Sequence, residues 1–183
     1  LNQYKTGAPV KEKTDFAILY DEKYLYIGAI LHESQMTLIR AKSLRNDHTV
    51  FLDDAIEIFL RPGETSHDLD YFHFAANSLG SRFGDAKASL SHSQRVGNKT
   101  VEWYAKTRKY ADRWTVEIAI PLKIIRPAIE NNAYWRLNIC RNENPSTEVS
   151  SWSLSPGGFH FPDKFGYLKG IDFNGKFVSL KKV

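Results

Sequence analysis

The chain has 183 residues, of which 42% are hydrophobic and 13% aromatic, enough for one β-rich domain with a core of its own. Its 25 basic residues are interspersed with 21 acidic ones, which argues against a nucleic-acid groove, since such grooves need a concentrated cationic stripe. The single cysteine, Cys140, excludes an intrachain disulfide, and no apolar run approaches the roughly 20 residues of a membrane span.

Four strands are predicted in the first half of the chain. Thr14–Tyr20 and Tyr24–His32 are apolar runs separated by a plausible hairpin turn at Asp21-Glu22-Lys23. The run 55–60 alternates isoleucine and leucine with other residues and ends at Arg61-Pro62-Gly63. Tyr71–Asn77 also alternates, and its polar set, which includes His73 and Asn77, could face a ligand.

The second half predicts further strands and little helix. The runs 101–109 and 113–120 are typical of a hairpin across 110–112, and a helical turn is expected within 122–129. The run 135–141 alternates apolar with polar residues, a polar loop covers 142–162, and closing strands are expected at 165–173 and 177–180. The predicted core residues with period-two spacing are Ile58, Trp114, Ile118, Ile120 and Leu137.

About nine short strands at regular spacing indicate an all-β fold, a two-sheet antiparallel β-sandwich of the jelly-roll or immunoglobulin-like kind with at most short helical turns. We expect 1–183 to form a single domain. Since it begins at Leu1 rather than at Met, we expect it to be excised from a larger protein.

Signatures of catalysis are missing from the sequence, which has no phosphate-binding loop, His-Glu-x-x-His motif or Gly-x-Ser-x-Gly elbow. The chain is therefore predicted not to be an enzyme. A glycoside hydrolase remains an alternative, because Glu57 and Glu117 lie in apolar strands and could face each other across a cleft. The stronger interpretation is that both carboxylates are partners of arginine or of backbone N–H groups.

The polar loop 142–162 contains Trp152, which is either a plug over the end of the sandwich or a platform for a ligand. Sugars stack their C–H faces on aromatic rings and need polar partners for their hydroxyl groups. We therefore predict that Trp152 and Phe51 flank a shallow carbohydrate site. The polar residues expected around it are His73, Asn77, Asn138 and Arg141.

Seven segments in a fixed order resemble a family 9 carbohydrate-binding module and together span most of the chain. They are 20–27 (YDEKYLYI), 53–60 (DDAIEIFL), 71–77 with Gly80, 114–121 (WTVEIAIP), 135–141, Trp152-Ser153 and 160–166 (HFPDKFG).

The resemblance implies a β-sandwich without catalysis of its own that holds sugar between two aromatic rings. By position, Phe51 stands where the family usually has a tryptophan, and Trp152 is similar to the late aromatic residue. Members often carry structural calcium, for which oxygen ligands are expected. The candidate ligands in this chain are Asp53, Asp54, Asp70 and Asp85.

The resemblance also implies a biological setting. It predicts a secreted, periplasmic or cell-surface module that binds an oligo- or polysaccharide and keeps an attached enzyme or surface protein near it. The alternative to sugar binding is a structural or interaction domain of a larger protein, with Phe51 and Trp152 buried against a neighbour.

Overall fold

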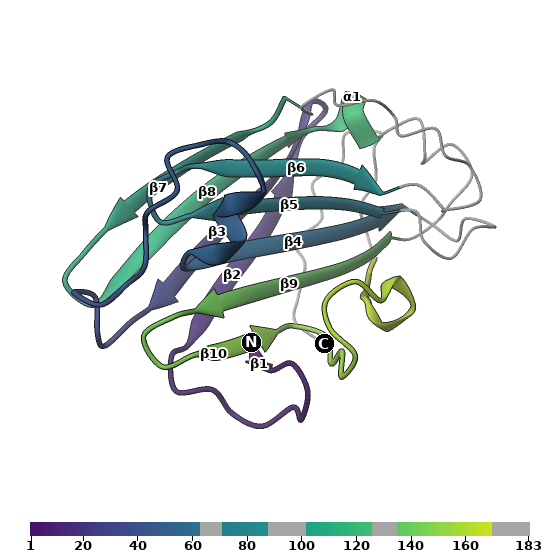
Figure 1. Ribbon diagram of the computed structural model, residues 1–183. Coiled ribbons are helices and arrows are strands. Elements are labelled where there is room, and N and C mark those ends of the chain that lie inside the picture. Colours follow the sequence, from purple (N-terminus) through teal and green to yellow (C-terminus); the bar gives the residue numbers. More distant parts are fainter. Residues whose placement is uncertain (63–70, 88–101, 126–134, 170–183) are drawn as a thin grey trace.

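Two antiparallel sheets face each other in the computed structural model, which describes residues 1–62, 71–87, 102–125 and 135–169 (Figure 1). The larger sheet has seven strands in the order β1-β10-β9-β4-β5-β6, with β11 also paired to β9. The smaller sheet has four strands in the order β2-β3-β8-β7. The predicted two-sheet antiparallel sandwich is confirmed.

The bounds of the strands follow the sheet order. The smaller sheet consists of β2 (Thr14–Tyr20), β3 (Tyr24–His32), β8 (Arg113–Pro121) and β7 (Tyr104–Lys109). The larger sheet consists of β1 (Asn2–Gln3), β10 (Glu148–Ser151), β9 (Trp135–Glu143), β4 (Ala55–Pro62), β5 (Tyr71–Asn77), β6 (Arg82–Lys87) and β11 (Gly166–Leu168).

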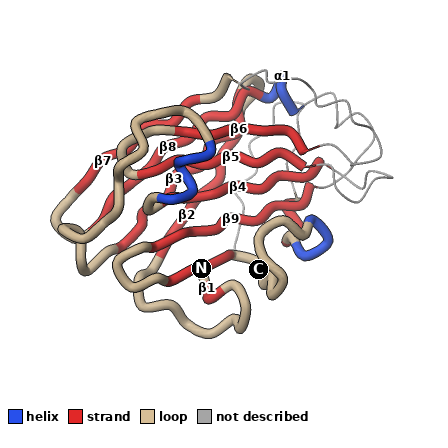
Figure 2. Tube along the Cα trace, in the orientation of Figure 1, coloured by secondary structure: helices blue, strands red, loops and turns tan. Residues whose placement is uncertain are grey.

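Helix is limited to three short segments in the described part of the chain (Figure 2). They are η1 (His48–Leu52), α1 (Leu122–Ile125) and η3 (Pro162–Lys164). The helical turn predicted within 122–129 is therefore present as α1, and its last four positions lie outside the described residues. None of these helices is long and apolar enough to cross a membrane.

The core lies between the sheets because strand residues alternate between the two faces of a sheet. On the face that each sheet turns toward the other, here called the inner face, apolar side chains are almost fully buried. Those predicted from period-two spacing are all there: Ile58, Trp114, Ile118, Ile120 and Leu137.

The structure adds three strands to the predicted set, and the described residues form eleven strands. β10 lies within the predicted loop 142–162, β6 follows the turn at Gly80, and β1 lies in the first residues of the chain. β4 and β9 also continue beyond their predicted ends, to Pro62 and Glu143. β1 and β10 are strands because their backbones pair with β10 and β9, although their side chains show no apolar alternation. The closing strand expected at 165–173 is limited to β11, and 177–180 lies outside the described residues.

The outer face of the larger sheet, which points away from the smaller sheet, carries the residues of the candidate site. The alternation that buries Ile56, Ile58 and Leu60 turns Glu57 and Phe59 to this face. The short helix η1 packs against β4, β5 and β6 and lies across them in Figure 1.

Candidate functional site

A stack of three rings forms the centre of the candidate site on the outer face of the larger sheet. The imidazole of His73 lies between Phe51, at a centroid distance of 5.0 Å and an interplanar angle of 8°, and Phe59, at 4.2 Å and 14°. Its Nε2 is hydrogen bonded to Oε2 of Glu57 at 2.7 Å. We call Phe51, Glu57, Phe59, His73 and His160 the outer-face cluster.

Strand register brings this cluster together. Pairing of β4 with β5 sets Phe59 opposite His73, and Glu57 lies two residues earlier on the same face, opposite Ala75. The small side chain of Ala75 packs against Val50 of η1, which is fully buried. This contact seats η1 on the sheet, so that Phe51, the next residue, reaches the ring of His73.

The carboxylate of Glu57 is held in a fixed orientation. One carboxylate oxygen is hydrogen bonded to His73, and the other accepts a hydrogen bond from Nδ2 of Asn142 on β9. A carboxylate has about four lone-pair sites, so each oxygen can accept one more hydrogen bond, for instance from a hydroxyl group. Glu57 is thus a preset acceptor at the base of the cluster.

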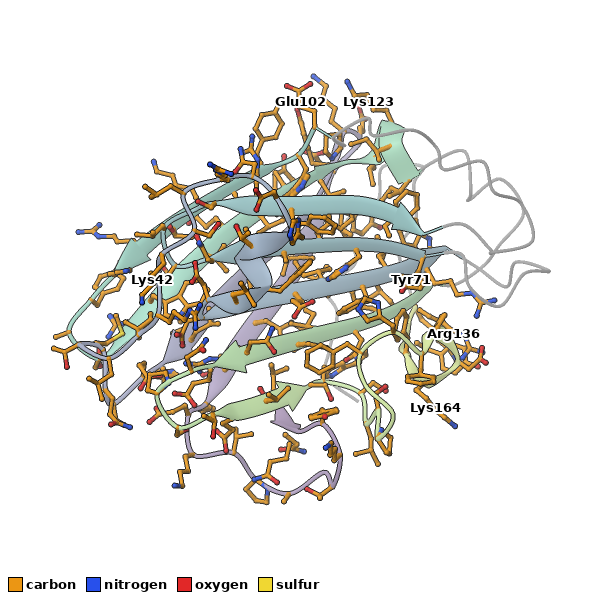
Figure 3. All side chains as sticks on the ribbon, in the orientation of Figure 1. Lys42, Tyr71, Glu102, Lys123, Arg136 and Lys164 are labelled. Atoms are coloured by element: carbon orange, nitrogen blue, oxygen red, sulfur yellow. The ribbon has the colours of Figure 1, made fainter. Side chains whose placement is uncertain are left out.

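Histidine and phenylalanine rings border the solvent side of the cluster. His160 is exposed, its Nδ1 lies 2.6 Å from Oη of Tyr71, and its ring meets that of His73 edge-on at 5.2 Å. Phe83 of β6 is half-buried and meets Phe51 edge-on at 4.8 Å. Figure 3 places Tyr71 and Arg136 at the same end of the larger sheet. The cluster therefore combines aromatic walls with a polar base.

Two predicted site residues on this face anchor loops. Asn77 is fully buried and donates from Nδ2 to Ser43 O and Asp53 Oδ2, both at 2.9 Å. Asn138 is also fully buried and exchanges two hydrogen bonds with the backbone of Ser153. Both amides are occupied in holding loops against the sheet.

The structure separates Arg141 from the outer-face cluster. Arg141 belongs to the inner face, where its guanidinium is 1% exposed and donates to Thr14 Oγ1 of the smaller sheet and to Oε2 of Glu33, both at 3.3 Å. The prediction that it lines one site with Phe51 and His73 is corrected, because alternation along β9 puts Arg141 on the side of Leu137 and Ile139.

Trp152 is also separated from Phe51. It follows β10 at the edge of the larger sheet, covers Gly166 and meets Phe16 of the smaller sheet edge-on at 6.2 Å. Its ring lies on the inner-face side, because Gly166 pairs with Leu137 of that face. Trp152 and Phe51 therefore do not flank a common site, and Trp152 lies outside the outer-face cluster.

Three buried carboxylates form a second polar centre at the end of the sandwich. Ligand oxygens of Glu33, Asp54 and Glu143 all lie within 4.8 Å of one another. Burial raises the pKa of Glu33 to about 7, and the charge of Glu143 adds to this, whereas Arg141 lowers it. Burial likewise raises the pKa of Asp54. Buried carboxylate oxygens with a single nearby arginine fit a hard cation such as Ca²⁺.

Among the predicted calcium ligands that the structure describes, Asp54 belongs to this group of carboxylates. Asp53 points elsewhere, and its Oδ2 accepts from the backbone N–H of Ser43 and from Asn77. Asp70 and the side chain of Asp85 lie outside the described residues.

The carboxylate pair considered for glycoside hydrolysis is not brought together. Glu57 is buried on the outer face of the larger sheet, whereas Glu117 is exposed on the outer face of the smaller sheet. The core of the sandwich lies between them, so this pair cannot act on one bond.

Glu57, Phe59, Tyr71 and His160 were not among the predicted site residues. A signal was present for the first three, because they alternate with the apolar residues of β4 and β5. Sequence spacing gives no register between strands, so their proximity could not be predicted. His160 lies in a loop without periodicity.

Comparisons with known proteins agree on one family. The family model described as "Carbohydrate family 9 binding domain-like" matches residues 2–170. Two similar structures are family 9 carbohydrate-binding modules from Caldicellulosiruptor kristjanssonii. The one in complex with glucose has a TM-score of 0.60 and 18% identity, over 92% of this chain and 82% of that chain. The one in complex with cellotriose has a TM-score of 0.58 and 20% identity, over 96% of this chain and 84% of that chain. At these identities the likeness shows the fold. No curated protein matches the chain.

Proposed function

The chain belongs to the carbohydrate family 9 binding domain-like family, and we propose that it is a non-catalytic domain that binds carbohydrate. The structures it resembles are in complex with glucose and cellotriose, which supports a β-glucan or a related glycan as the ligand class. The separation of Glu57 from Glu117 supports binding rather than hydrolysis, because it removes the acid–base pair that the sequence offered.

The sugar is proposed to bind at the outer-face cluster. The observation that carries this proposal is the ring stack of Phe51, His73 and Phe59 above a carboxylate that is held in place by two hydrogen bonds. The half-buried ring of Phe51 and the exposed ring of His160 offer contact to the C–H face of a pyranose, whereas the rings of Phe59 and His73 are almost fully buried. The slightly exposed carboxylate of Glu57 offers oriented acceptors to hydroxyl groups of the sugar. Since Phe51 is a phenyl rather than an indole ring, contact area is modest and we expect weak, selective binding.

The proposal extends to the setting of the domain. A domain of this family that binds a polysaccharide would hold an attached enzyme or surface protein near it, in a secreted, periplasmic or cell-surface location. Fractionation of cells that produce the full-length protein tests this, and recovery in the cytosolic fraction would contradict it.

A structural calcium ion is proposed at Glu33, Asp54 and Glu143. Glu33 directly follows β3, Asp54 directly precedes β4, and Glu143 ends β9. A divalent cation there would offset the mutual repulsion of the carboxylates and tie the three chain segments together.

Calorimetric titration with glucose and cellotriose tests the sugar site. We expect Phe51→Ala and Glu57→Gln each to weaken binding about tenfold or more, equivalent to ~1.4 kcal/mol or more. The matched control is Tyr110→Ala, which removes an exposed ring from the β7–β8 turn of the other sheet. Parent-like affinity in both cluster variants would contradict the proposed site, and release of shorter sugars from a polysaccharide would contradict a non-catalytic role.

A further inference from the structure

Three tyrosines gather on the outer face of the smaller sheet. Tyr24 and Tyr26 lie on β3 with their ring centroids 5.7 Å apart, and Tyr104 of β7 lies 6.3 Å from Tyr24. The ring of Tyr104 is 46% exposed, and Leu19 beside Tyr26 is 62% exposed. We call this surface, with Leu19 and Gly28, the tyrosine face.

Strand register arranges the tyrosine face in two parallel rows. The first row crosses the four strands at Leu19, Tyr26, Ala119 and Tyr104. The second row, two residues away along each strand, crosses at Ala17, Gly28, Glu117 and Lys106. From β3 to β7 each row spans about 10 Å, because neighbouring strands lie ~4.8 Å apart, and the rows are separated by about 7 Å.

Gly28, in the second row, leaves an open floor beside the rings of the first row. A Cβ built there would meet no atom within 4 Å, and its backbone lies outside the left-handed region. Ala17 and Ala119 beside it are also small. The rings of Tyr26 and Tyr104 therefore border a flat and accessible strip.

The polar groups beside this strip suit a neutral ligand rich in hydroxyl groups. Exposed Glu117 lies opposite exposed Lys106 in the register, so an acceptor and a donor adjoin the aromatic row. The hydroxyl of Tyr26 donates to Oδ2 of Asp21 at 2.8 Å, which fixes the position of its ring.

Two other classes of ligand fit less well. Nucleic acid requires a stripe of one charge sign, and here Lys106 faces Glu117. The fully buried core of a protein interface is depleted of charged residues, whereas this charged pair directly adjoins the aromatic row.

We propose that the tyrosine face is a second carbohydrate-binding surface, which holds the flat side of an extended polysaccharide chain. It lies on the opposite side of the domain from the outer-face cluster, with the larger sheet in front of the smaller one in Figure 1. Aromatic rings supply the contact area, and Glu117 and Lys106 supply hydrogen bonds along the chain. The proposal does not depend on the site at the outer-face cluster.

Gly28→Val is the most informative variant. Valine suits a strand, and the open space at Gly28 accepts it, so folding stability should be equal or higher while the strip is filled. Tyr104→Ala removes one ring of the aromatic row. Tyr110→Ala is the control, because it removes a comparably exposed tyrosine outside the tyrosine face.

The experiment compares partition of the domain onto insoluble cellulose with titration by soluble cellotriose. We expect Gly28→Val and Tyr104→Ala to lower partition onto cellulose about tenfold through loss of a second contact, with unchanged affinity for cellotriose at the outer-face cluster. Phe51→Ala should give the reverse pattern, with weakened titration and residual partition. The measurements can therefore contradict the proposal for one site without contradicting the proposal for the other.

Partition of both variants equal to that of Tyr110→Ala would overturn the proposal. A parent domain that is retained by none of cellulose, xylan, chitin and mannan would overturn it as well. Sedimentation that shows a dimer of the parent, dissociated by Gly28→Val, would instead identify the tyrosine face as a contact between copies of the chain.

Discussion

Replacement of Trp152 by alanine distinguishes a structural indole from a sugar platform. The residue is 39% exposed, so about three-fifths of it is covered, and Gly166 and Phe16 are among the groups it packs against. For a side chain of ~250 Å² this is roughly 150 Å² of contact, or up to ~4 kcal/mol at ~25 cal/mol/Å². Alanine retains part of that burial and the edge of the sheet can relax, so we expect a loss of about 2–3 kcal/mol.

Urea denaturation followed by far-UV circular dichroism measures this loss, since that signal comes mainly from the backbone. Leu154→Ala is the control, because Leu154 is 50% exposed on the same loop and should cost less than about 1 kcal/mol. Affinity for cellotriose should remain within twofold of the parent. A Trp152→Ala domain of parental stability that binds cellotriose markedly more weakly would show that the indole contacts sugar rather than stabilising the edge of the sheet.

Three further predictions concern stability. Gly84→Ala should cost about 1–3 kcal/mol in urea denaturation, because its Cβ would lie 2.6 Å from Nε1 of the buried Trp103; an unchanged midpoint would show that the indole moves freely. With calcium removed by chelator, Arg141→Met should cost about 3–5 kcal/mol, since it leaves Glu33 buried without a cation, and a loss below about 1 kcal/mol would contradict the buried pair. Calcium at 100 times its dissociation constant should stabilise the parent domain by ~2.7 kcal/mol, and chelator should remove this stabilisation. Glu143→Gln should gain little stability from calcium. A melting temperature of the parent that neither calcium nor chelator changes would exclude the ion.

Much of the fold could be predicted because apolar residues in the central strands recur with period two. Trp114, Ile118 and Ile120 alternate without interruption, and their strand was predicted almost to the residue. β10 gave no such signal, since Glu148–Ser151 contains one apolar residue and owes its extended form to pairing with β9. Backbone pairing between distant segments leaves no periodicity in a single sequence.

The site was harder to predict, because it depends on which face each residue occupies and on how the strands pair. The face of Arg141 could have been inferred, since it continues the alternation of Leu137 and Ile139. The meeting of Glu57 with His73 could not, because it requires the register between β4 and β5. Phe51 and Trp152 lie outside regular strands. Their residue type favours a sugar contact, but the sequence does not show which face of the sandwich their side chains occupy.

Chemical-shift mapping by NMR during titration with cellotriose tests most directly that sugar binds at the outer-face cluster. The imidazole signals of His73 and His160 and the indole N–H signal of Trp152 report on opposite faces of the larger sheet. We predict saturable shifts of both imidazole signals with little change at the indole. Saturable shifts at the indole of Trp152 with unperturbed His73 and His160 would show that sugar binds at Trp152 and not at the outer-face cluster.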